Sequence, residues 1–161
     1  MMLILLISPF LLQGLAITFD EFYFHHKRGL GWWERLGHPM DTFALLICYS
    51  FIQNSGPSSQ NILIFIYLSI FSSLLITKDE FVHNIECGPM EQWLHSILFI
   101  IHPITLIVLG LLWTNSLVVP LEYNNFLNGF IKGQFIFMSL FLLYQILYWS
   151  IPWEKIITQQ K

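Results

Sequence analysis

The segment Ile17–His25 reads I-T-F-D-E-F-Y-F-H and closes an apolar run that starts at the first residue. The segment Ile76–His83 reads I-T-K-D-E-F-V-H and closes a second apolar run. A Glu-x-x-x-His pair follows each copy, as E-R-L-G-H at 34–38 and E-Q-W-L-H at 91–95. Because the motifs keep the same order in both halves, the sequence predicts an internal repeat of apolar helices that carry polar half-sites.

The composition of the chain is that of a membrane protein. Its 161 residues correspond to a single domain, residues 1–161. The chain is 55% hydrophobic and 11% charged, whereas a soluble domain is about 25% charged. The mean hydropathy of +0.63 agrees with this contrast. We therefore expect an integral membrane protein whose partner is the lipid bilayer, and the net charge of -3 argues against nucleic acid as a partner.

Five stretches have the apolar character of membrane spans, which need about 20 residues. They lie at about 1–19, 40–54, 61–77, 93–114 and 130–151. The second and third stretches are short, so we expect them to gain length from flanking residues or from tilt. No Lys or Arg precedes the first stretch, so we interpret it as a retained helix and not as a secretory signal.

The repeat organises these stretches into an all-α integral membrane protein with five transmembrane helices. Repeat 1 covers about 1–54 and repeat 2 about 61–114, each as a helical hairpin with a polar half-site between its helices. Both hairpins run in the same direction, which predicts a four-helix core with a pseudo-twofold axis near the membrane normal. The last stretch, about 130–151, has no counterpart and is expected as an extra C-terminal helix.

The distribution of positive charge predicts the orientation. Lys27, Arg28, Arg35 and Lys78 lie in the two polar segments, whereas the connector at 54–61 carries no Lys or Arg. Since cytoplasmic loops are enriched in Lys and Arg, we expect both polar segments and the C-terminus on the cytoplasmic side. The N-terminus is then expected outside.

The polar half-sites place ligand-type side chains at helical spacing, since residues three or four apart share a helix face. Each predicted helix end carries at least one carboxylate with a histidine on the same face. The candidate metal ligands are Glu21, His25, Glu34, His38, Asp41, Asp79, Glu80, His83, Glu91, His95 and His102.

Mixed carboxylate and imidazole ligands suit iron, manganese or zinc. Inward Glu and Glu-x-x-His residues are how helical bundles hold two ions side by side, and the candidate ligands outnumber what one ion needs. We expect two metal ions, with iron favoured and zinc or manganese as alternatives. The ligand set is similar in logic to that of ferritin-like dimetal proteins, although only Glu80–His83 has the Glu-x-x-His spacing.

Several polar residues have a structural interpretation beside the functional one. Near the helix ends, ionisable groups sit at lipid headgroups at little cost, and the two interpretations are balanced for Asp20, His26, Lys27, Arg28 and Glu86. Pro39 disfavours helical backbone at His38, so we expect Glu34 and His38 to be split between an interfacial turn and the following helix.

Three further polar residues lie outside the repeated motifs. Cys87 is either a soft metal ligand or an ordinary loop cysteine, and the second interpretation is favoured. Gln13 and Gln145 lie inside apolar helices and are expected to hydrogen-bond between helices.

These patterns predict a membrane-embedded metal-dependent oxidoreductase, with di-iron favoured, of the oxidase, hydroxylase or desaturase type. A lipid-soluble substrate is expected, such as an acyl chain, an isoprenoid or a quinol. The sequence shows no flavin, nucleotide or iron–sulfur motif, so an electron-donor protein is an expected partner. The alternatives are a zinc-dependent lipid hydrolase and a non-enzymatic protein that transports metal ions or protons; haem bound by two histidines ranks below both because it leaves the glutamates unexplained.

Overall fold

The computed structural model describes residues 2–81, 87–117 and 119–150, and within these ranges the chain forms helices and no strand. The prediction of an all-α protein is confirmed. The elements are α1 (Met2–Phe19), η1 (Asp20–His25), α2 (His26–Arg28), α3 (Trp32–Asn54), α4 (Ser59–Leu75), η2 (Ile76–Asp79), α6 (Pro89–Trp113) and α7 (Leu121–Ser150). The first three follow one another without a break, so the first helical stretch extends past the predicted boundary at residue 19.

Four helical stretches are long and apolar enough to cross a membrane, which indicates a membrane protein. They are Met2–Arg28, Ser59–Lys78, Pro89–Trp113 and Leu121–Trp149. The 23-residue helix α3 is comparably long, but its first turns carry Glu34, Arg35, His38 and Asp41. These side chains lower the apolar character of α3, and its membrane crossing stays a prediction.

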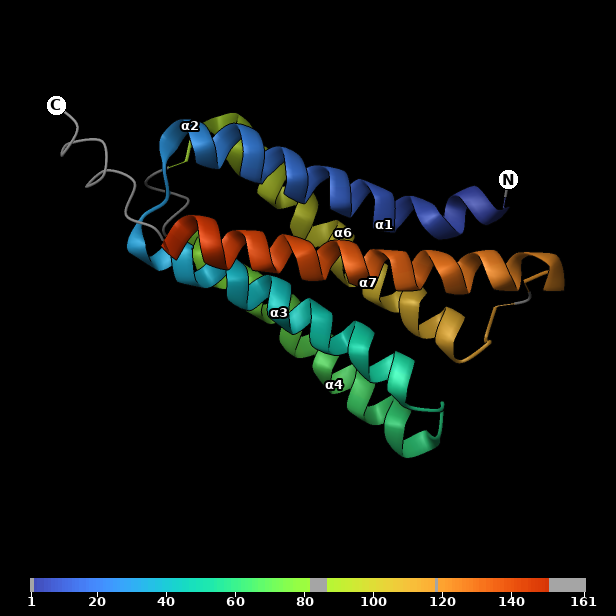
Figure 1. Cartoon of the computed structure of the whole chain (residues 1–161). Helices are drawn as coiled ribbons and strands as arrows, with labels where there is room; N and C mark the ends of the chain where they lie inside the picture. Colours follow the sequence, from blue (N-terminus) through green and yellow to red (C-terminus); the bar gives the residue numbers. More distant parts are fainter. Residues whose placement is uncertain (1, 82–86, 118, 151–161) are drawn as a thin grey trace, which may run out of the picture.

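Successive long helices run in alternating directions, so their polar ends gather at the end of the bundle where α2 lies (Figure 1). The most extensive helix contacts join α3 to α7, α1 to α6 and α3 to α4. In the sequence repeat, α1 corresponds to α4, and α3 corresponds to α6. The α1–α6 contact and the α4–α3 contact are therefore equivalent under the repeat. The observed pairing is therefore compatible with a pseudo-twofold arrangement, which itself stays a prediction.

Helix α3 begins eight residues before the predicted start at residue 40. The backbone N–H of Gly31 donates to Glu34 Oε2 at 3.1 Å, which caps the first turn. Glu34, His38 and Pro39 all lie inside α3, so the predicted split of Glu34 and His38 between a turn and the helix is wrong. A proline removes one backbone hydrogen bond, and the capped first turns and the packing of α3 on α4 and α7 hold the helix together across it.

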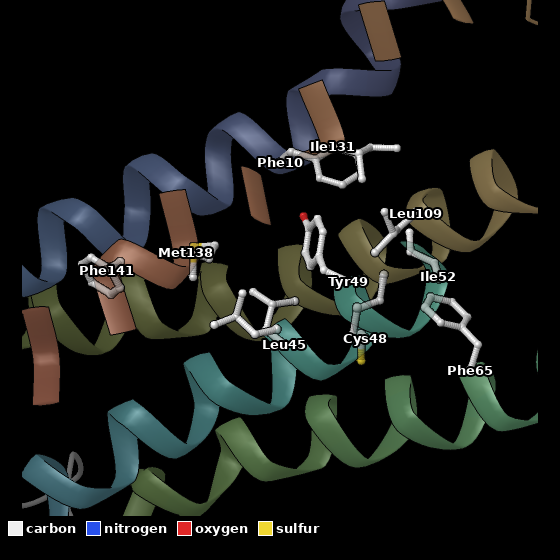
Figure 2. Packing of buried hydrophobic residues seen from close by; sticks show 12 residues of the cluster. Phe10, Leu45, Cys48, Tyr49, Ile52, Phe65, Leu109, Ile131, Met138 and Phe141 are labelled. Carbon is white, nitrogen blue, oxygen red and sulfur yellow. The ribbon is translucent and has the colours of Figure 1, made fainter. Parts of the chain in front are cut away.

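The apolar core lies away from the polar end and is built by all five long helices. Figure 2 shows Phe10 of α1, Tyr49 of α3 and Leu109 of α6 converging with side chains of α7. Tyr49 is 2% exposed and Leu109 is fully buried. Phe10 also meets Phe130 of α7 edge to face, with ring centroids 5.7 Å apart. This packing fixes the helices whose ends carry the polar residues.

Helices α4 and α6 approach each other closely at Gly110. A Cβ atom at this position would lie 2.7 Å from Cε1 of Phe65, a buried ring that also contacts Trp113. Small residues permit such close helix packing in membranes. The absence of a side chain at Gly110 is therefore a packing requirement.

We predict that Gly110→Val destabilises the protein by about 1–3 kcal/mol, because overpacking forces the Phe65 ring out of its position. The matched control is Gly133→Val in α7, where a Cβ atom has no neighbour within 4 Å. Thermal unfolding of the purified protein in detergent measures both. A Tm for Gly110→Val equal to that of Gly133→Val would contradict the close-packing interpretation.

Candidate metal centre

Four buried side chains from both halves of the chain meet at the polar end of the bundle. Asp20, His25, Glu91 and His95 each offer one ligand atom, and these four atoms lie within 4.8 Å of one another. Asp20 Oδ2 lies 3.1 Å from His25 Nε2 and accepts a hydrogen bond from His95 Nε2 at 3.0 Å. His25 Nε2 is 4.0 Å from Glu91 Oε1. We call these four residues the cluster.

A π-helical turn, η1, places Asp20 and His25 in the cluster together. An α-helix would align Glu21 with His25, which is the pair that the sequence predicts. A π-turn is wound with i→i+5 hydrogen bonds, so residues five apart move toward a common face. Asp20 and His25 are separated by this interval, and both are at least 95% buried. Asp20 is thus a cluster residue that the α-helical period could not identify.

The second half of the cluster comes from the start of α6. Pro89 occupies the first turn of this helix, where its missing N–H costs nothing. Glu91 and His95 follow at a spacing of four residues and face the same direction, as predicted. They are 3% and 4% exposed.

Glu21 lies beside the cluster and orients one of its histidines. Its Oε2 accepts from His25 Nδ1 at 3.3 Å, which leaves His25 Nε2 directed at the other three residues. Its Oε1 accepts from Trp149 Nε1 at 2.6 Å. Gln145 Nε2 donates to Glu21 at 3.4 Å, and Gln145 Oε1 accepts from Thr42 Oγ1 at 2.8 Å. A carboxylate behind a histidine is the usual support of a metal-ligating imidazole.

Arg28 joins the two Glu-x-x-x-His pairs. Its guanidinium donates to both oxygens of Glu34, at 2.6 and 2.9 Å, and to Glu91 Oε1 at 3.0 Å. Glu34 and Glu91 hold the same position in the two sequence copies, so one cation compensates both. From the sequence alone, a headgroup contact and a functional role are equally favoured for Arg28. In the structure, its guanidinium lies between the buried carboxylates of Glu34 and Glu91.

The remaining predicted ligands are distributed around the cluster. The His38 ring stacks on His25 with centroids 4.6 Å apart. Asp41 accepts from Lys78 Nζ at 2.7 Å on both oxygens, and Glu80 is exposed. His83, Glu86 and the side chain of Asp79 lie outside the described residues.

His102 lies two turns beyond His95 along α6 and forms a separate polar group. Its Nδ1 is 2.9 Å from Gln13 Nε2 of α1, and its Nε2 is 3.0 Å from Ser72 Oγ of α4. This contact confirms the predicted interhelical role of Gln13, and the bonds of Gln145 to Thr42 and Glu21 confirm the same role there. His102 is 4% exposed and is joined to other helices, not to the cluster.

A cavity of about 90 Å³ connects the cluster with the Gln13–His102 pair. Asp20, His25 and His95 form one part of its wall, and Gln13 and His102 form another. The rest of the wall combines apolar side chains, which include Ile17, Leu45, Leu98, Phe99 and Met138, with the polar side chains of Glu21, His38, Asp41, Thr42 and Gln145. The cluster therefore borders a partly open cavity whose surface is mostly apolar.

Cys87 lies next to the carboxylate of Glu91 and the guanidinium of Arg28 and is 9% exposed. Burial raises the pKa of its thiol well above the usual range, and the neighbouring carboxylates act in the same direction. The thiol form is thereby favoured over the thiolate. The interpretation of Cys87 as an ordinary loop cysteine stays a prediction.

Comparison of the chain with protein-family models, with curated proteins and with solved structures gives no match.

We predict that Arg28→Met destabilises the protein by about 3 kcal/mol, because removing one partner leaves buried charge without compensation. Lys27→Met is the matched control, since Lys27 is an exposed neighbour. The double variant Arg28→Met/Glu34→Gln should recover part of the loss. Thermal unfolding measures all three, and equal Tm values for Arg28→Met and Lys27→Met would contradict the bridging role.

Proposed function

We propose that this chain is a membrane-embedded metalloprotein whose cluster binds a divalent transition-metal ion. The single observation that carries the proposal is the convergence of four buried ligand atoms, two carboxylate and two imidazole, from distant parts of the chain. Metal–ligand bonds of about 2.0–2.2 Å keep two ligand atoms of one ion within about 4.4 Å of each other. The cluster at 4.8 Å needs only a small contraction to meet this limit.

The second support is the orientation of His25. Its Nδ1 is held by Glu21, and its Nε2 lies 3.1 Å from Asp20 Oδ2 but makes no hydrogen bond of good geometry within the described part of the chain. A buried ring nitrogen without a hydrogen bond is costly, and a metal ion would satisfy it. Asp20 Oδ1 is a second buried atom of the cluster that makes no hydrogen bond to the described residues.

We further propose that the metal serves an oxidoreductase that acts on a lipid-soluble substrate. The oxygen and nitrogen ligands suit iron, which would supply the redox chemistry, and a substrate that fills the adjoining cavity would keep water away from it. A second ion, predicted from the repeat, would draw on the candidate ligands of both copies that the cluster does not use. The orientation with the cluster on the cytoplasmic side and an electron-donor protein belong to the same proposal.

A zinc-dependent lipid hydrolase would use the same ligands with one open position for water. The hydrolase and the oxidoreductase can be distinguished by identifying the bound metal. Zinc is colourless and redox-inert, whereas iron gives visible absorption that changes on reduction. The identity of the copurifying metal therefore separates the two functions.

We predict that the purified protein contains stoichiometric metal and that His25→Ala lowers the metal content to less than a tenth of this value. His26→Ala is the matched control, because the adjacent His26 ring is exposed and hydrogen-bonds to Tyr144 and to the backbone carbonyl of Glu21, outside the cluster. Elemental analysis by mass spectrometry measures both variants, and an iron or zinc result selects between the two chemistries. Metal-free wild-type protein from metal-replete cells, or full metal content in His25→Ala, would refute the proposal.

We also predict that Trp149→Phe lowers metal affinity by about 10–100-fold, the usual effect of removing a group that supports a metal ligand. The substitution removes the hydrogen bond to Glu21 and keeps an aromatic ring. Trp93→Phe is the control, because Trp93 lies on α6 and is 61% exposed. Competition with a chelating dye measures the metal affinity of both variants. Equal affinities would contradict a role of Glu21 and Trp149 in orienting His25 for metal binding.

A further inference from the structure

Gln13 is a buried amide inside an apolar helix, and only one of its two polar side-chain atoms is hydrogen-bonded to the described residues. Its side chain is 3% exposed, and its Nε2 contacts His102 Nδ1 at 2.9 Å. Its Oε1 makes no hydrogen bond to any described residue. An acceptor buried in this way costs about 1–3 kcal/mol, so the position is unfavourable unless something donates to it.

The neighbours of Gln13 cannot supply that donor. When Gln13 Nε2 donates to His102 Nδ1, the imidazole carries its proton on Nε2, which faces Ser72 Oγ at 3.0 Å. Both ring nitrogens of His102 are then engaged. Gln13 Oε1 is left as the acceptor at this end of the cavity, whose wall includes Gln13.

The cavity provides space for a ligand group at this acceptor. Its volume of about 90 Å³ exceeds the roughly 10–15 Å³ that one water molecule needs on the same measure. The end of an aliphatic chain fits in this space. The apolar wall formed by Ile17, Leu98 and Met138 suits alkyl carbon.

We propose that the cavity binds the hydroxyl end of an aliphatic alcohol, with the hydroxyl donating to Gln13 Oε1. Ketones, esters and ethers lack this donor and leave the amide oxygen unsatisfied, so the site selects alcohols over these oxygen compounds. Water can occupy the cavity in the absence of ligand, and an alcohol replaces it favourably because its hydroxyl reproduces the hydrogen bond.

This inference deepens the proposed function, because it names the substrate class of a site that adjoins the cluster. Gln13 lies seven residues before Asp20 on the same helical stretch, which is about 10 Å along the axis. Carbon atoms near the hydroxyl would then lie in the part of the cavity between Gln13 and the cluster. The binding itself requires no metal and can be tested without it.

The experiment uses an eight-carbon alkanol that carries a diazirine, and its O-methyl ether as the matched probe. Both are photolysed with the full-length protein in nanodiscs after chelator treatment, and mass spectrometry maps the labelled residues. We expect the alkanol to label Ile17, Leu98 and Met138 about tenfold more than the ether does, which corresponds to one hydrogen bond of about 1.4 kcal/mol. Equal labelling of these residues by the two probes would overturn the proposal.

Variants identify the acceptor. Gln13→Leu and Gln13→Met both remove the amide, and Met keeps the side-chain length in case Leu disturbs packing. In each folded variant, as judged by its Tm, labelling by the alkanol should fall to the level of the ether; unchanged labelling would overturn the proposal. Gln53→Leu, at an exposed glutamine of α3, should keep the tenfold preference. Because metal is absent throughout, alcohol selectivity and metal binding succeed or fail separately.

Discussion

The contact of Asp20 with two imidazoles from different helices is the interaction on which the polar end of this bundle depends. Asp20 Oδ2 lies within 3.1 Å of His25 Nε2 and 3.0 Å of His95 Nε2, and all three side chains are buried. In an apolar environment, water does not compensate a buried carboxylate, so the protein must supply partners. These partners tie α1 to α6, and the surrounding bonds of Arg28 and Trp149 extend the same network to α3 and α7.

The two sequence copies contribute unequally to this network because they are wound differently. The first D-E-F segment forms a π-turn, which brings Asp20 onto the face of His25. The second copy enters its D-E-F segment through the 3₁₀ turn η2, from which Lys78 reaches Asp41 on α3. The Glu-x-x-x-His pairs are closer to equivalence, since Glu34 and Glu91 share Arg28. Symmetry in the sequence therefore produces one compact cluster of four among the described residues.

Much of this arrangement was predictable from hydropathy and spacing, and the rest depended on local winding and tertiary contacts. Apolar runs located the helices, and the four-residue spacing identified Glu91 with His95. The same spacing selected Glu21 instead of Asp20, because a π-turn has no simple sequence signature. Trp149 belongs to a helix without a repeated motif, so its contact with Glu21 was visible only in three dimensions. Gln13 was recognisable because an amide inside an apolar helix requires a partner.

The charges at the polar end support the proposed divalent ion. Within the described part of the chain, Arg28 pairs with Glu34 and Glu91, whereas Asp20 and Glu21 contact His25. With neutral histidines, these groups carry three uncompensated negative charges, a costly state at low dielectric. One divalent ion at the cluster reduces this excess to one, and it replaces the histidine protons that would otherwise offset it. The side chains that hold α1, α3, α6 and α7 together at this end thus form a network that metal binding would complete.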